Sequence, residues 1–228
     1  MTPHMDFSLG HFPVDLVLFA LIAAFLALRL RSVLGKKAGL QAAPVAPPMA
    51  REPVGPIIEG RPEQSSTTKF DIPASGTRLG QVLTAVTEKD RGFTPQQFLT
   101  GVEGAFRQVV TAFAAGDRAV LQERLTPEAF TAFDAAITAR EAAGQTQRSE
   151  IRGINSIAIE DVRMADIAAG TAVSIDARVV SDQISLTVDS NGQPVHGTES
   201  VTEFSDLWTF ERLLNAGSSW RLSAARSA

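Results

Sequence analysis

The first apolar segment of the chain is an uncharged run over residues 16–28, which is followed by basic residues. With its apolar neighbours up to position 34, the run approaches the roughly 20 residues that a helix needs to cross a bilayer. A helix also satisfies its own backbone hydrogen bonds, as lipid requires of a single spanning segment. The pattern therefore predicts a transmembrane anchor over residues 1–34. Its candidate residues are the apolar Leu16, Phe19, Leu21, Ile22, Phe25 and Leu28 and the basic Arg29, Arg31, Lys36 and Lys37.

Two other interpretations of this run are a cleaved signal peptide and a helix that lies on the membrane surface. A signal peptide has positive charge before its apolar run and a small-residue cleavage site after it. Here Asp6 and Asp15 precede the run, and the bases follow it. Because basic flanks tend to stay in the cytoplasm, we expect an uncleaved single-pass anchor with its N-terminus outside and the rest of the chain in the cytoplasm.

The next segment, residues 35–92, is predicted to be a disordered linker. It contains seven prolines between positions 44 and 73, and proline breaks helices. Apolar residues do not recur regularly, so the segment cannot bury enough surface to offset the entropy of ordering it. Residues 79–86 are interpreted as a transient amphipathic turn, and the alternative is a short helix or a docking motif.

Helical spacing of apolar residues begins after Thr94. This residue suits an N-cap, Pro95 suits the first helical position, and Gln97 can complete a capping box. Apolar residues then recur every three or four positions, as on one buried helix face. The pattern predicts three helices, which begin after Thr94, Asp117 and Thr126, the first ending at Gly116 and the third at Gly144.

In the second half of the chain the apolar period changes to two, which is typical of strands with one buried face. Helices followed by strands predict an α+β domain over residues 93–228, in which the helices pack on one face of a curved antiparallel sheet. A turn is predicted at Ser190-Asn191-Gly192, and the alternating stretches are residues 157–159, 173–179, 184–188, 208–214 and 220–224.

Composition and charge narrow the possible functions of this domain. The chain of 228 residues has no Cys, which excludes disulfides and thiolate metal sites. The whole chain carries a net charge of −4, but from Thr94 onward 11 Arg, no Lys and 17 acidic residues give −6. Because binding to nucleic acid needs clustered cations, we expect no nucleic-acid partner.

No set of residues with the pattern of a catalytic or metal site is found. The histidines His4, His11 and His196 are scattered and lack metal-ligand spacing. Gly101 and Gly104 do not form a phosphate loop, because they stand inside a regular helical pattern; they are interpreted as close-packing points. We therefore expect no catalytic residues, no metal and no cofactor.

One set of residues is shared in order and spacing with a known family. In this chain it comprises Phe98, Gly101, Ala105, Phe106, Val109, Ala112, Phe113, Gly116, Asp117, Leu121, Leu125, Phe133, Ala136, Ile137, Arg140, Glu141, the run Asp206–Arg212 and the run Ser219–Leu222. From about Phe93 to Ala225 the chain resembles the Tim44-like domain, a family named for a mitochondrial inner-membrane import subunit. The layout of anchor, basic patch and Pro-rich linker is similar to that of bacterial members.

The resemblance implies an α+β fold related to the cone-shaped NTF2-like class. It also implies contact with inner-membrane lipids, cardiolipin included, and a scaffold role with a translocation, chaperone or membrane-assembly partner. A mitochondrial relative links a chaperone motor to the import channel through its N-terminal half; this chain lacks the long charged helical region, so that role is not carried over. The preferred prediction is an inner-membrane-anchored, non-enzymatic adaptor. A ribosome- or translocon-docking protein is a further alternative.

A curved sheet under helices can leave a ligand pocket. The alternative for its aromatic candidates is that they form the core, and for its basic candidates that they are solvated surface residues. The pocket candidates are Phe106, Val110, Phe113, Phe130, Phe133, Ile137, Trp208, Phe210 and Trp220, and the candidates for binding a lipid head group are Arg118, Arg124, Arg140, Arg148 and Arg152.

The runner-up function is a small-molecule-binding or enzymatic cone-fold domain. Enzymes of that fold use a carboxylate whose pKa is shifted by apolar walls. The nearest candidates here are Asp134, Asp176 and Glu203. Asp176 lies between Ile175 and Ala177, so it points to the opposite face of its strand, where we expect it to be exposed to solvent.

Overall fold

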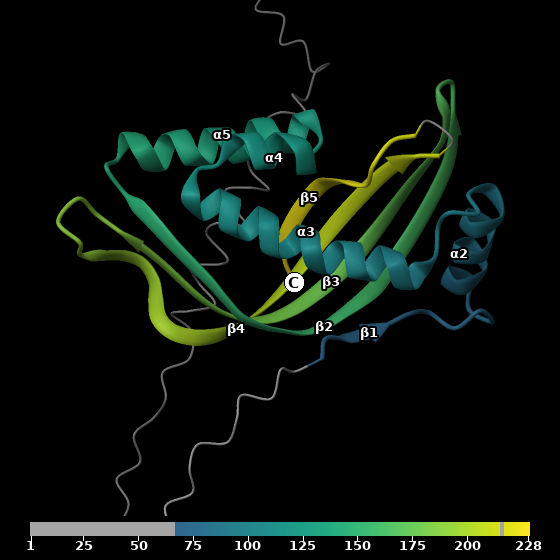
Figure 1. The fold of residues 1–228 in the computed structure, drawn as a ribbon, viewed down its shortest axis with the longest axis horizontal. Helices are drawn as coiled ribbons and strands as arrows, with labels where there is room; N and C mark the ends of the chain where they lie inside the picture. Colours follow the sequence, from purple (N-terminus) through teal and green to yellow (C-terminus); the bar gives the residue numbers. More distant parts are fainter. Residues whose placement is uncertain (1–66, 215–216) are drawn as a thin grey trace, which may run out of the picture.

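The computed structural model describes residues 67–214 and 217–228 (Figure 1). In these ranges one short strand comes first, four helices follow it, and the other four strands come last. The elements are β1 (Lys69–Asp71), α2 (Arg78–Lys89), α3 (Pro95–Ala115), α4 (Arg118–Arg124), α5 (Pro127–Ala142), β2 (Thr146–Ile167), β3 (Gly170–Val188), β4 (Pro194–Leu213) and β5 (Arg221–Ser227).

The strands form one strongly curved sheet in the order β1-β2-β3-β4-β5. Strands β2 to β5 pair antiparallel, whereas β1 pairs parallel to β2, so the sheet is mixed rather than purely antiparallel. Figure 1 shows α3 running across the concave face of the sheet, with α4 and α5 beyond its C-terminal end. The predicted α+β architecture, with helices on one face of a curved sheet, is confirmed.

The helix caps form where the sequence placed them. Thr94 Oγ1 accepts a hydrogen bond from the Gln97 amide at 3.2 Å, and Gly116 ends α3 with a φ of 73°. Phe93 and Phe98 flank the cap with ring centroids 6.2 Å apart, which is a hydrophobic staple. Within the described residues, the Gln97 side chain does not return a bond to the Thr94 amide. The caps of α4 and α5 are Asp117, which accepts from the Val120 amide, and Thr126, which accepts from the Ala129 amide.

The core lies between α3 and the concave face of the sheet. Phe106 of α3 is fully buried, and its ring centroid is 4.7 Å from that of Trp208 on β4. On β3 the residues Ile175, Ala177 and Val179 are also fully buried, as their alternation predicted. The burial of this apolar surface is the main favourable contribution to folding.

The prediction of a linker over residues 35–92 is wrong for its last part. Residues 69–71 form β1 on the edge of β2, and Thr77 caps α2 by accepting a bond from the Gly80 amide at 3.0 Å. Leu83 and Val86 of α2 belong to the core. The folded domain therefore begins well before Phe93, and α2 is a packed helix rather than a transient turn.

The predicted anchor and residues 35–66 of the predicted linker lie outside the described residues. Among the helices of the described part, none has both the length and the apolar character to span a membrane.

Candidate functional site

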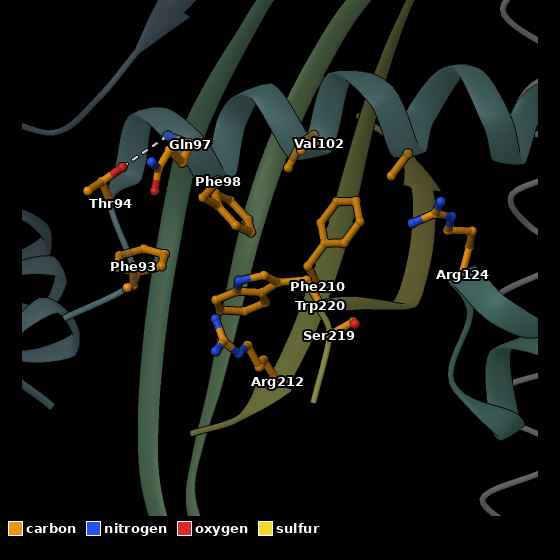
Figure 2. Close-up of a pocket in the computed structure, with 13 residues that line it drawn as sticks. Phe93, Thr94, Gln97, Phe98, Val102, Arg124, Phe210, Arg212, Ser219 and Trp220 are labelled. Carbon is orange, nitrogen blue, oxygen red and sulfur yellow. Dashed lines mark hydrogen bonds between the residues drawn. The ribbon is translucent and has the colours of Figure 1, made fainter. Parts of the chain in front are cut away.

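A pocket opens between the N-terminal half of α3, strand β4 and the residues that directly precede β5 (Figure 2). Its volume is about 280 Å³. Four aromatic side chains form much of its wall: Phe93, Phe98, Phe210 and Trp220. The ring centroid of Trp220 lies 4.9 Å from that of Phe98 and 5.9 Å from that of Phe93, and Phe98 and Phe210 meet edge to face at 5.9 Å.

Local structure accounts for the position of each of these rings. Phe93 and Phe98 are the two halves of the staple at the start of α3, so the cap at Thr94 fixes both. Phe210 stands on β4, and Trp220 directly precedes β5, which pairs with β4. The pocket is thus built where the beginning of one helix meets the last hairpin of the sheet.

Two arginines bring positive charge to this aromatic wall. Arg212 forms an ion pair with Asp90 at 2.9 Å, and its guanidinium lies 6.0 Å from the centroid of the Trp220 ring. In the described part of the chain, the buried Arg212 Nε has no hydrogen-bond acceptor. Arg124, at the last turn of α4, forms no ion pair within the described residues. Figure 2 shows Arg124 and Arg212 on different sides of the pocket.

Gly101 and Gly104 are not close-packing points, contrary to the sequence analysis. A Cβ atom at either position would meet no atom of the described residues within 4 Å. Both glycines stand on exposed positions of α3, and Gly101 lines the pocket. The helical pattern identified the helix correctly, but it did not show that the face carrying the two glycines is exposed.

Replacing Gly104 by alanine is expected to stabilise the domain. Glycine inside a helix costs roughly 0.5–1 kcal/mol relative to alanine because it loses more backbone freedom on folding. The added Cβ meets no other atom, so the gain should appear nearly in full. Urea denaturation of Gly104→Ala should show a higher midpoint with an unchanged slope; an unchanged or lower midpoint would contradict the open space seen at this position.

Only two of the nine predicted pocket residues, Phe210 and Trp220, line the pocket. Phe106, Trp208 and Ile137 are buried in the core. The remaining four are partly buried and pack against the core: Val110, Phe113, Phe130 and Phe133.

Sequence reasoning assigned Phe93, Phe98 and Arg212 to no ligand site, although they line the pocket. A hydrophobic staple pairs the residue before an N-cap with the fourth residue of the helix. This pattern around Thr94 was the signal that could have placed Phe93 and Phe98 together at the N-terminus of α3.

The five predicted head-group arginines do not form one basic rim. Arg118 donates two bonds to Glu141, at 3.0 and 2.9 Å, and one to Asp134 at 2.6 Å. These bonds from Arg118 hold the pKa of the Glu141 carboxyl below its usual value. Arg148 and Arg152 both pair with Glu150, at 3.2 and 3.0 Å, and are about half exposed.

Arg140 has a structural position instead. Its Nη2 donates to the backbone oxygens of Phe113 and Ala114 at 2.8 and 3.2 Å, and its Nη1 donates to Gln147 Oε1 at 2.6 Å. The guanidinium also lies 5.2 Å from the centroid of the Phe113 ring. Arg140 therefore joins the end of α3 to α5 and to the start of β2.

The three candidate carboxylates of the runner-up function lie outside the pocket. Asp134 pairs with Arg118, and Glu203 is exposed on β4. Asp176 faces away from the core, as predicted, but it is buried rather than exposed, with only 8% of its surface accessible.

Three hydrogen bonds offset the cost of burying the Asp176 carboxylate. Two come from Arg163, at 3.0 and 2.8 Å, and one comes from the Thr209 hydroxyl at 2.8 Å. Burial by itself raises the pKa of Asp176, but these bonds outweigh it and leave the pKa below its usual value. Across the described ranges, no group of three or more His, Asp or Glu side chains could hold a metal ion.

Comparison with known proteins identifies the kind of domain. The sequence model of the Tim44-like domain family matches residues 79–227. Among solved structures, the intermembrane space region of the chloroplast protein ARC6 is similar, with 12% identity over 59% of this chain and 97% of that one and a TM-score of 0.43. An NTF2-like protein from Cytophaga hutchinsonii shows 13% identity over 60% of this chain and 100% of that one, with a TM-score of 0.26. No curated protein matches the sequence.

Proposed function

Because the chain belongs to the Tim44-like domain family, we propose that it is a membrane-anchored, non-enzymatic adaptor. Its domain contacts inner-membrane lipids, cardiolipin included, or a translocation or membrane-assembly partner. The apolar run over residues 16–28 is the proposed single-pass anchor, and the domain stands on the cytoplasmic side.

The observation that supports a non-enzymatic role for this pocket is its lining. Its thirteen lining residues include aromatic side chains and two arginines, but no Asp, Glu or His. General acid–base chemistry uses such groups near their titration range, and an arginine stays protonated. A pocket of this kind suits the binding of an apolar group with nearby negative charge.

With the proposed anchor in the membrane, weak contacts suffice for the domain to bind lipid or a partner at the membrane surface. Attachment to the membrane converts the second contact into an intramolecular one, so its effective concentration reaches the millimolar range for short flexible tethers. Arg124, which has no ion pair among the described residues, and Arg148 and Arg152, which share Glu150 and are about half exposed, are the candidates for a head group. Arg118 and Arg140 are more fully engaged within the domain.

Hydrogen exchange of the full-length protein in nanodiscs tests the lipid contact. Nanodiscs of phosphatidylcholine with and without cardiolipin are compared at low and at high salt. We expect slower amide exchange in the domain when cardiolipin is present, with the difference reduced at high salt because screening weakens contacts between exposed charges. The double variant Arg148→Gln/Arg152→Gln should reduce this protection.

Arg107→Gln is the matched control. Arg107 is an exposed arginine on α3 that pairs with Glu103, and it does not belong to the predicted head-group set. Its removal should leave the protection unchanged. If cardiolipin does not change exchange in any part of the domain, the lipid contact is wrong and the adaptor must act through a protein partner, which crosslinking in native membranes would then identify.

A further inference from the structure

The pocket beside α3 is small for a membrane lipid. Its volume of about 280 Å³ lies at the lower end of the roughly 300–1,000 Å³ that small-molecule sites occupy. It can hold one ring system or one short chain, but not both acyl chains of a phospholipid. The size therefore separates this site from the lipid contact of the proposed function.

The chemistry of the wall is also specific. Phe98 meets both Phe210 and Trp220 edge to face, and together these rings give the pocket an apolar wall. Two arginines line the same space, in a domain whose net charge is negative.

The two arginines differ in their freedom to bind a ligand. Arg212 is held by Asp90, and its Nε, which has no acceptor among the described residues, is closed off from solvent. Arg124 has no partner carboxylate within the described residues, so its charge is available. Guanidinium groups bind carboxylates through strong, frequently bidentate hydrogen bonds.

We infer that this pocket binds a small apolar acid, an aryl or short alkyl carboxylate, with its apolar part against Phe98 and Trp220 and its carboxylate toward an arginine. The inference goes beyond the adaptor role and does not depend on it. It would give the domain a ligand-dependent state next to α3, the longest helix of the described part.

A larger side chain in place of Gly101 would fill the pocket without disturbing the core. Gly101 lines the pocket, and a side chain at this position would enter open space rather than the packed core. Gly104 stands one turn further along α3, is equally unobstructed, and does not line the pocket. Leucine at either position favours the helix, so the two variants differ mainly in what they do to the site.

Calorimetric titration of the full-length protein, held in a maltoside detergent, tests the inference with naphthalene-1-acetate. Its neutral counterpart, naphthalene-1-acetamide, has nearly the same shape without the charge. We expect the acid to bind and Gly101→Leu to weaken binding by at least about tenfold, whereas Gly104→Leu stays within about twofold. Arg124→Gln should weaken binding of the acid by about tenfold, which corresponds to the loss of one charge-assisted hydrogen bond. The same variant should leave binding of the amide unchanged.

Three results would overturn the inference. The first is no binding of the acid, the second is equal binding of acid and amide, and the third is an equal effect of the Gly101→Leu and Gly104→Leu variants. Circular dichroism of each variant distinguishes a closed pocket from a misfolded domain. Loss of acid binding with cardiolipin-dependent protection intact would refute this site alone, and the reverse result would refute only the lipid contact.

Discussion

Replacing Arg140 by alanine is expected to lower the free energy of unfolding by about 2–3 kcal/mol, because hydrogen bonds to a charged group contribute roughly 1.5–3 kcal/mol. The guanidinium donates to two backbone oxygens at the end of α3, those of Phe113 and Ala114, and the Phe113 oxygen also accepts from the Gly116 amide at 3.3 Å. Burial lowers the pKa of Arg140, but an arginine stays charged at any ordinary pH. The measurement is urea denaturation followed by the fluorescence of Trp208 and Trp220.

Arg148→Ala is the matched control, since Arg148 stands on the adjoining strand and is 59% exposed, with one ion pair to Glu150. Its loss should cost no more than about 1 kcal/mol, as is usual for exposed pairs. Arg140→Lys keeps the charge but not the fork of donors, so it should fall between wild type and Arg140→Ala. Equal destabilisation by Arg140→Ala and Arg148→Ala would show that Arg140 is an ordinary surface residue.

Replacing Asp176 by asparagine is expected to cost about 2 kcal/mol at neutral pH, because it breaks a largely buried pair of bonds with Arg163. The cost stays below that of a fully buried pair since half of the Arg163 side chain is exposed. Asp161→Asn removes the other carboxylate bonded to Arg163, at 2.6 Å, from a more exposed position. That control should cost less than about 1 kcal/mol.

The contribution of Asp176 should also depend on pH. Its pKa in the folded protein lies below the ordinary value of about 3.9. A carboxyl whose pKa is depressed on folding adds stability that is complete above its unfolded pKa and is lost as the pH falls through its folded pKa. The difference between wild type and Asp176→Asn should therefore be constant from about pH 7 to pH 5 and shrink below about pH 4. A difference that stays constant down to pH 3 would show that the charge of Asp176 is not what stabilises the fold.

Local signals in the sequence were sufficient to place most of the helices. A cap acts through bonds within one turn, so Thr94, Asp117 and Thr126 are recognisable without knowledge of the rest of the molecule. The left-handed φ of Gly116 is likewise set within its own turn. Strand alternation also identified the buried face of β3, because successive side chains point to opposite faces whatever lies above them.

The signal failed where packing rather than local chemistry decides the structure. The segment 78–89 follows a Pro-rich stretch, and its apolar positions are too few to stand out, yet Leu83 and Val86 are buried by the sheet. Neither β1 nor α2 has a reason to form alone, since three-residue strands and short helices gain their stability from tertiary contacts.

The sequence by itself determined the class of the domain, its family, and the order of its helices and strands from Thr94 onward, because caps, periodicity and motif order are local properties of the chain. Only the tertiary structure decided that Asp176 is buried, since its partner Arg163 comes from the neighbouring strand. It also decided which aromatics line a pocket. Phe106 and Phe98 share one helix pattern, but the last hairpin of the sheet covers the first and leaves a cavity beside the second. Side chains brought together from distant positions create such a site, and no local pattern records that meeting.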